Sequence, residues 1–227
     1  MIYFDRTNLK EHAPKLLLSA LLFWLPAIAF FRIADEVRER EAIRVDTSLL
    51  EWLHGFATPG INRLAVFVTT LGDGWLIGII AACIGAYLLY KRNWRQTIFF
   101  LGSVCGAGAA NIALKLLFHR ARPSLWSPIL PENDYSFPSG HAMLTVAFAL
   151  SLVYLLWETC WRWLAVAVAV LYVAAVGVSR LYLGVHFPTD VLAGWCASLI
   201  WVGIMAYLAG KRRHFPTSSP DSKQSPS

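Results

Sequence analysis

The sequence of 227 residues is poor in charge, since Asp, Glu, Lys and Arg make up only 15% of it while 57% is hydrophobic. The mean hydropathy is +0.52. A soluble domain of this size has no core large enough to bury so much apolar side chain. The composition therefore nearly excludes a water-soluble globular protein and indicates a membrane protein.

Cysteine is also scarce. The four cysteines are scattered without a CxxC pair, and three of them lie inside apolar runs, where cysteine behaves as a small hydrophobe. The sequence thus predicts neither a disulfide framework nor a zinc site. The formal net charge of +6 gives little reason to expect nucleic-acid binding, because the cytoplasmic loops of membrane proteins carry such an excess.

Six apolar runs are long enough to cross a bilayer as helices, which takes about 20 residues each. These runs cover residues 15–31, 64–90, 97–117, 141–157, 163–178 and 189–208. After the first run and a charged stretch, apolar residues in segment 47–54 recur at helical spacing, which indicates a helix lying on the membrane surface. We therefore predict an all-α, polytopic membrane protein, a bundle of six transmembrane helices with a short interfacial helix after the first span.

The loops differ in their content of lysine and arginine, which are retained on the cytoplasmic side. Three cations within residues 91–95 mark the loop after the second span as cytoplasmic. Both termini are then cytoplasmic as well. We expect a single membrane domain over residues 1–210 and a polar, Ser- and Pro-rich cytoplasmic tail over 211–227, a composition that cannot fold alone. Alternatively, the first run is a cleaved signal peptide that ends in Ala27-Ile28-Ala29.

Ionisable and polar side chains gather at the outer ends of the predicted spans. Such groups are costly to place in or beside a membrane helix, so we take them as candidates for functional residues. They are Lys115, His119, Arg120, Arg122, Ser139, His141, Arg180, His186 and Asp190. Several cations and two histidines at one depth describe a site for an anion with several oxygens, of which phosphate is the obvious example.

Local spacing adds detail to this anion site. Lys115 and Arg122 are seven residues apart, which predicts that they share one face of a helix ended by Pro123. Ser139 is expected to cap the fourth span. The free N–H groups there, including that of Gly140, would cradle phosphate oxygens.

Other polar residues near the site have less certain roles. Asp190 follows His186 by four residues, so its carboxylate can reach one imidazole nitrogen and raise the basicity of the other. Asn111, one turn before Lys115, is expected to support that lysine through a hydrogen bond. Asp73, between two glycines, marks either a break where the chain enters the bilayer or a partner for a cation. For His119 and Arg120 we favour an interfacial position without a role in the site.

Together these residues resemble the three-part signature of the type 2 phosphatidic acid phosphatases. Its parts are Lys115 followed by six residues and Arg122-Pro123, then Pro138-Ser139-Gly140-His141, then Ser179-Arg180 followed by five residues, His186, three residues and Asp190. Every signature position is filled. The superfamily includes bacterial phosphatidylglycerophosphate and undecaprenyl-diphosphate phosphatases.

The resemblance implies a role for each signature residue. His186 would attack phosphorus to form a phosphohistidine, Asp190 would orient it, and His141 would protonate the leaving oxygen and later activate water. The phosphate would be held by Lys115, Arg122, Ser139, Gly140 and Arg180. Three fixed cations can neutralise the developing charge without a metal, and we expect neither a metal nor another cofactor.

The sequence therefore predicts a lipid phosphatase in a bacterial inner membrane, with its site on the outer, periplasmic side. Its partner would be a membrane lipid such as undecaprenyl diphosphate, phosphatidylglycerophosphate or phosphatidic acid, and the oligomeric state is not readable. Two alternatives stay open. A phosphotransferase with the same site would differ only in its acceptor, and a non-enzymatic anion carrier would need a polar path through both leaflets, of which only the outer half is present.

Overall fold

A computed structural model describes residues 6–39, 43–127 and 129–211, and its regular secondary structure is entirely helical within these ranges. The helices are α1 (Arg6–Glu39), α2 (Ile43–His54), α3 (Pro59–Thr70), α4 (Gly74–Tyr90), α5 (Trp94–Phe118), α6 (Gly140–Leu156), α7 (Arg162–Tyr182) and α8 (Pro188–Lys211). The predicted all-α class is confirmed. The tail predicted beyond Lys211 lies outside the described residues.

Several of these helices suit a lipid bilayer. Four stretches of the described chain are long and apolar enough to cross a membrane: Pro59–Tyr90, which joins α3 and α4, Trp94–Phe118, Arg162–Tyr182 and Pro188–Gly210. Helix α6 is also apolar but has only 17 residues. The chain is thus a bundle of apolar membrane helices, whereas the count of six spans and the interfacial position of α2 stay predictions.

Two helix boundaries differ from those expected. Helix α1 continues to Glu39, through charged residues that we placed outside the first span. Helix α3 begins at Pro59, five residues before the predicted second run, because Thr58 caps it by accepting a hydrogen bond from Ile61 N and proline suits the first helical turn. The predicted interruption at Gly72-Asp73-Gly74 is the break between α3 and α4.

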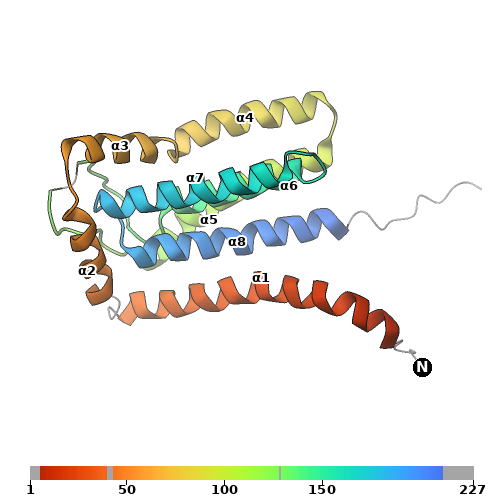
Figure 1. Ribbon diagram of the computed structural model, residues 1–227, viewed down its shortest axis with the longest axis horizontal. Helices are drawn as coiled ribbons and strands as arrows, with labels where there is room; N and C mark the ends of the chain where they lie inside the picture. The colour runs from red at the N-terminus through yellow and green to blue at the C-terminus, as the bar shows by residue number, and fades with distance from the viewer. Residues whose placement is uncertain (1–5, 40–42, 128, 212–227) are drawn as a thin grey trace, which may run out of the picture.

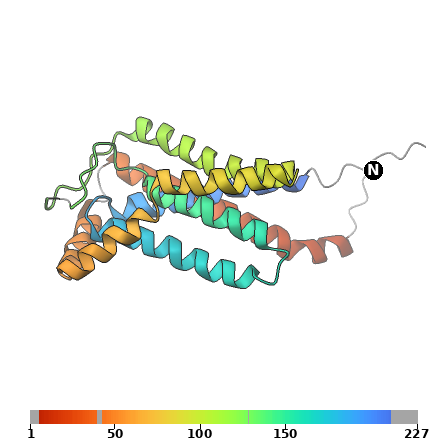
Figure 2. The ribbon, with the colours of Figure 1, turned by 90° about the horizontal axis from the view of Figure 1, so that it is seen from above.

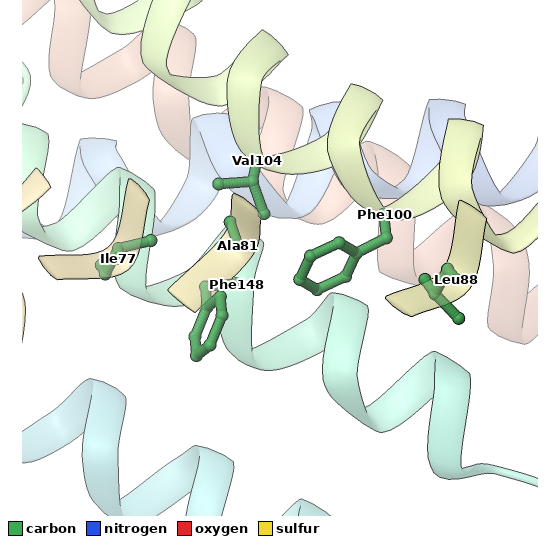
Figure 3. Packing of buried hydrophobic residues seen from close by; sticks show 6 residues of the cluster. All are labelled: Ile77, Ala81, Leu88, Phe100, Val104 and Phe148. Carbon is green, nitrogen blue, oxygen red and sulfur yellow. The ribbon is translucent and has the colours of Figure 1, made fainter. Parts of the chain in front are cut away.

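The core of the bundle lies between α4, α5 and α6. Figure 3 shows the buried side chains that meet there, which are Ile77, Ala81, Leu88, Phe100, Val104 and Phe148. Helix α8 packs closely on the other side of α5, since a Cβ atom at Gly106 would lie 2.2 Å from the Trp201 ring and the Trp201 indole donates to Gly102 O at 3.1 Å. These contacts fix α5 between its neighbours.

The packing brings distant signature segments to one end of the bundle. In Figure 1, α2, the connection between α5 and α6, and the turn from α7 to α8 lie together at the left end. Figure 2 shows the same end from above, with the connection between α5 and α6 projecting from it. Every signature residue lies at this end.

Candidate active site

A cavity of about 520 Å³ lies at this end of the bundle, and residues from all three parts of the signature line it. Its wall includes Lys115 of α5, Gly140 and His141 of α6, and His186 of the turn between α7 and α8. Glu132 and Asp134 of the α5–α6 connection also line it. The structure therefore assembles the three sequence segments into one site, as the signature predicts.

His186 lies between a carboxylate and a guanidinium. Asp190 Oδ2 is 3.5 Å from His186 Nδ1, and the same carboxylate accepts hydrogen bonds from Ser136 Oγ and from the Phe187 N–H. On the opposite side of the ring, Arg122 Nη1 is 3.2 Å from His186 Nε2. Asp190 thus meets the imidazole at the nitrogen that faces away from the cations, which leaves Nε2 directed toward them.

The environment of His186 favours the neutral imidazole. The side chain is 1% exposed. Burial, followed by the charges of Arg180 and Arg122, lowers the pKa of His186 well below its ordinary value of 6.5. At neutral pH the ring therefore keeps a lone pair, which is the form needed for nucleophilic attack.

Ser139 begins α6 as predicted. Its hydroxyl accepts a hydrogen bond from Ala142 N at 3.4 Å, so it is the N-cap, and the side chain is fully buried. Its own N–H donates to the backbone oxygen of Asp190 at 3.0 Å. The first turn of α6 is therefore tied to the first turn of α8, which begins at Pro188 as expected.

Asn111 has a different partner from the one predicted. Its amide donates to Pro138 O at 3.0 Å instead of bonding to Lys115. A Cβ atom at Gly140 would lie 3.0 Å from Asn111 Oδ1. Asn111 consequently positions the turn before α6, and glycine lets that turn approach α5 closely.

The predicted helical face shared by Lys115 and Arg122 is wrong. Helix α5 ends at Phe118, where His119 takes the left-handed conformation and its N–H bonds to Lys115 O. Arg122 lies in the following connection and reaches Val185 O at 2.7 Å. The turn at His119 folds the chain back over the site, so the two cations meet there although they are not on one helix.

Arg180 is the most deeply buried cation of the site. Its side chain is 1% exposed, and Nη1 donates to Thr69 Oγ1 at 3.0 Å. Nη2 pairs with Glu132. The remaining Nε is buried and has no hydrogen-bond partner among the described residues. An unmet buried donor is costly, so this nitrogen is suited to an anionic oxygen.

Two carboxylates of the α5–α6 connection pair with the cations of the site. Glu132 contacts Arg122 and Arg180, and Asp134 contacts Arg122 and Lys115. Although partial burial raises the pKa of Asp134, hydrogen bonds from Lys115 and Arg122 lower it to about 2. Burial also raises the pKa of Glu132, but the charge of Arg180 holds it below 4.5. Sequence reasoning missed both residues, because no local pattern relates them to the cations.

His141 also has a carboxylate partner. Its Nε2 lies 2.8 Å from Asp73 Oδ1, so the break between α3 and α4 contributes to the site. Of the two roles left open for Asp73, the structure supports the break in the helix, while the side-chain partner found in the site is His141 and not a lysine or arginine.

Arg120 is not merely interfacial. It donates to Asp190 and, at 2.9 Å, to Asp46 of α2, and it reaches Thr189 Oγ1 at 2.8 Å. Asp46 is 1% exposed and accepts from the Thr189 hydroxyl and N–H. By contrast, His119 is exposed and lies against the Tyr135 ring, in keeping with the expectation for it.

Comparison with known proteins identifies the family. Residues 96–214 match the PAP2 superfamily, a match of just over half the chain. The chain belongs to the PAP2 superfamily. The resemblance stated from the signature is therefore confirmed.

The PAP2 relatives include phosphatidylglycerophosphatase B of Bacillus subtilis, which is 31% identical over 149 residues, 63% of this chain and 72% of the relative. The undecaprenyl-diphosphatase of Sulfolobus acidocaldarius is 30% identical and covers 81% of this chain and 89% of its own. Both are lipid phosphatases by name, which confirms the predicted enzyme class at family level.

The fold has a counterpart among solved structures. The crystal structure of a transmembrane PAP2-type phosphatidylglycerolphosphate phosphatase from Bacillus subtilis matches with a TM-score of 0.76 and 26% identity, over 84% of this chain and 98% of that one.

In the described part of the present chain, no three His, Cys, Asp or Glu side chains are grouped to hold a metal ion.

Proposed function

We propose that this protein removes a phosphate group from a membrane lipid phosphate or diphosphate through a phosphohistidine on His186. The observation that carries the proposal is the meeting of Lys115, Arg122 and Arg180 beside a neutral, carboxylate-oriented imidazole. Three cations at one place stabilise the charge of a transferring phosphoryl group, and the imidazole supplies the nucleophile.

In the first step, His186 Nε2 attacks phosphorus and the bond to the leaving oxygen breaks. His141, across the cavity, gives its proton to that oxygen. The Asp190 carboxylate, 3.5 Å from His186 Nδ1, stabilises the charge that the ring gains. The phosphoryl oxygens lie against the three cations, the free Nε of Arg180, and the N–H groups after Ser139.

In the second step, a water molecule takes the place of the departed alcohol or phosphate. His141, now neutral, accepts a proton from this water as its oxygen attacks phosphorus. The P–N bond to His186 breaks, inorganic phosphate leaves, and both histidines return to their starting forms. All charges in this cycle are met by side chains of the chain itself.

The surroundings of the cavity favour an amphiphilic substrate. Ile112 and Leu116, on either side of Lys115 in α5, are 63% and 60% exposed, as expected for side chains that face lipid tails. The headgroup of a lipid such as undecaprenyl diphosphate, phosphatidylglycerophosphate or phosphatidic acid would then reach the cations while its chains stay in the bilayer.

We further propose six crossings, formed by α1, by α3 with α4, and by α5, α6, α7 and α8, in one domain over residues 1–210. With the basic loop at residues 91–95 in the cytoplasm, the site lies on the periplasmic side of a bacterial inner membrane and both termini lie inside. Labelling of single cysteines placed in the α5–α6 connection would report this side.

Removal of metal ions is expected to leave activity intact. The measurement is release of inorganic phosphate by the detergent-purified protein from a panel of lipid phosphates and diphosphates, with and without EDTA. Release of phosphate that persists in EDTA supports the proposal, and the rates for the different lipids rank them as substrates. Loss of release in EDTA, with recovery on adding a divalent cation, would contradict the metal-independent mechanism. Transfer of phosphate to a second lipid, without free phosphate, would favour a phosphotransferase.

Replacing Glu132 by glutamine is expected to strengthen substrate binding. The lipid phosphate must displace the Glu132 carboxylate from Arg180 and Arg122, and the neutral amide competes less for these cations. We expect Glu132→Gln to lower KM several-fold and to change kcat less. Glu158→Gln, on an exposed side chain, is the matched control. A higher KM in Glu132→Gln would show that the carboxylate assists substrate binding instead.

A further inference from the structure

The break between α3 and α4 places Asp73 beside His141. One carboxylate oxygen, Oδ1, lies 2.8 Å from His141 Nε2, and the other accepts from the Trp75 indole N–H at 3.2 Å. The signature assigns no role to Asp73. It also lies outside residues 96–214, which match the family, so its place in the site follows from the structure alone.

Asp73 does not perform the usual task of an aspartate at the start of a helix. It occupies the N-cap position of α4, where an aspartate side chain normally accepts a hydrogen bond from the first helical N–H groups. Its side chain makes no such bond. One carboxylate oxygen accepts from the Trp75 side chain of α4 and the other contacts His141 of α6, so capping of the α4 backbone does not account for this residue.

The break itself is held firmly against the neighbouring helices. Tyr172 of α7 donates its hydroxyl to Leu71 O at 2.7 Å. A Cβ atom at Gly72 would lie 2.6 Å from Val176 and 3.2 Å from the His141 ring, so only glycine fits there. These contacts fix the backbone that carries Asp73 close to the imidazole.

We propose that Asp73 is a positioning residue for the proton transfers of His141. The inference rests on the proposed function. Asp73 holds the Nε2–H of the ring, so Nδ1, which bonds to no described residue, is the nitrogen that exchanges the proton. Each histidine of the site then has its own carboxylate, Asp190 for the nucleophile His186 and Asp73 for His141.

The proton moves in a closed cycle. As the P–O bond to the leaving group breaks and the P–N bond to His186 forms, His141 Nδ1 gives its proton to the leaving oxygen and keeps Nε2–H on Asp73. In hydrolysis, Nδ1 takes a proton from water. Two other charged groups act on this ring from neighbouring elements, Arg180 of α7 and Glu132 of the α5–α6 connection. Their charges have opposite signs, so their effects on the ring oppose each other. Asp73, in contrast, is hydrogen-bonded to the ring itself.

The test varies the leaving group. Diacylglycerol leaves phosphatidic acid as an alkoxide and needs a proton, whereas a nitrophenolate leaves an amphiphilic nitrophenyl phosphate without one. We expect Asp73→Asn to lower kcat/KM about 100-fold for phosphatidic acid but no more than about threefold for the aryl phosphate. This split separates loss of proton transfer from loss of structure.

Two further variants sharpen the test. Trp75→Phe removes the other hydrogen bond to Asp73 and is expected to behave as wild type. In a His141→Gln background, Asp73→Asn is expected to cause no additional loss, because its effect passes through His141.

Equal loss on both substrates, by misfolding or otherwise, would overturn the inference while leaving the proposed function intact. So would an additional loss in the His141→Gln background. Wild-type protein that releases phosphate from neither substrate would contradict the proposed function, and this inference with it.

Discussion

His186→Asn is expected to abolish phosphate release from every lipid phosphate that the wild-type protein hydrolyses. Asparagine retains a polar side chain that can bond to the buried Ser136 and Asp190, so the turn between α7 and α8 is expected to fold. It has no nitrogen lone pair that can attack phosphorus. Removal of a nucleophile costs far more than removal of a binding group, and we expect a loss of at least about 1,000-fold in kcat.

The matched control is His119→Asn. His119 is exposed at the end of α5, in the left-handed conformation that asparagine adopts readily. This variant is expected to keep wild-type activity. Phosphate release by folded His186→Asn at more than a few per cent of the wild-type rate would show that the nucleophile lies elsewhere.

Arg120→Met is expected to destabilise the protein as well as inactivate it. Arg120 bridges the carboxylates of Asp46 and Asp190, whose side chains are 2% and 0% exposed, and its guanidinium lies 4.3 Å from the Phe187 ring centroid. Methionine has a similar apolar stem but no charge. Both buried carboxylates would then lose their cation.

The size of this effect follows from the cost of an unpaired buried charge. Removing one partner of a buried ion pair costs about 3–5 kcal/mol, which for a chain of this size corresponds to a fall in Tm of about 10 °C. Activity should fall even where the protein is still folded, because Asp190 then loses one of the contacts that hold it beside His186 and the only one from a cation that the described residues provide.

Thermal unfolding in detergent, followed by circular dichroism, measures the change in Tm. Arg63→Met, which removes an exposed arginine of α3, is the control and should leave Tm within a few degrees of wild type. The double variant Arg120→Met with Asp46→Asn should recover part of the lost stability, since one unpaired charge is gone. An unchanged Tm in Arg120→Met would contradict the proposed network.

The residues of the site that sequence could identify are those with fixed spacing. Asp190 lies one helical turn after His186, and Ser139 directly precedes an apolar helix, so elementary helix geometry predicts a histidine–carboxylate contact and an N-cap. The break at Gly72-Asp73-Gly74 is also visible in the sequence. Local rules succeeded for these pairs because each lies within one helix or at its first turn, whereas the pairing of Lys115 with Arg122 on one helical face failed because α5 ends between them.

The remaining partners depend on how distant segments pack. Asp46 and Arg120 are 74 residues apart, and Glu132 meets Arg180 only because the α5–α6 connection folds over the site. The end of α5 shows the same limit. We expected the helix to continue to Pro123, but His119 turns the chain four residues earlier.

The buried faces of the helices were not predictable either. A membrane helix is apolar on all sides, so hydrophobic periodicity does not distinguish core from lipid. In α5, Phe100 is fully buried while Ile98, two residues away, is 57% exposed. Only the packing of α4, α6 and α8 against α5 determines which of its apolar residues are buried and which are exposed to lipid.

The most direct test of the account is to trap the phosphorylated protein. His141→Gln should still cleave an amphiphilic nitrophenyl phosphate, whose leaving group needs no proton, but should hydrolyse the intermediate slowly because water lacks its base. After an alkaline quench, mass spectrometry is expected to find one phosphoryl group on His186, labile to acid and absent when His186 is asparagine. Release of nitrophenolate without phosphate on His186, or with phosphate on another residue, would contradict the proposed mechanism.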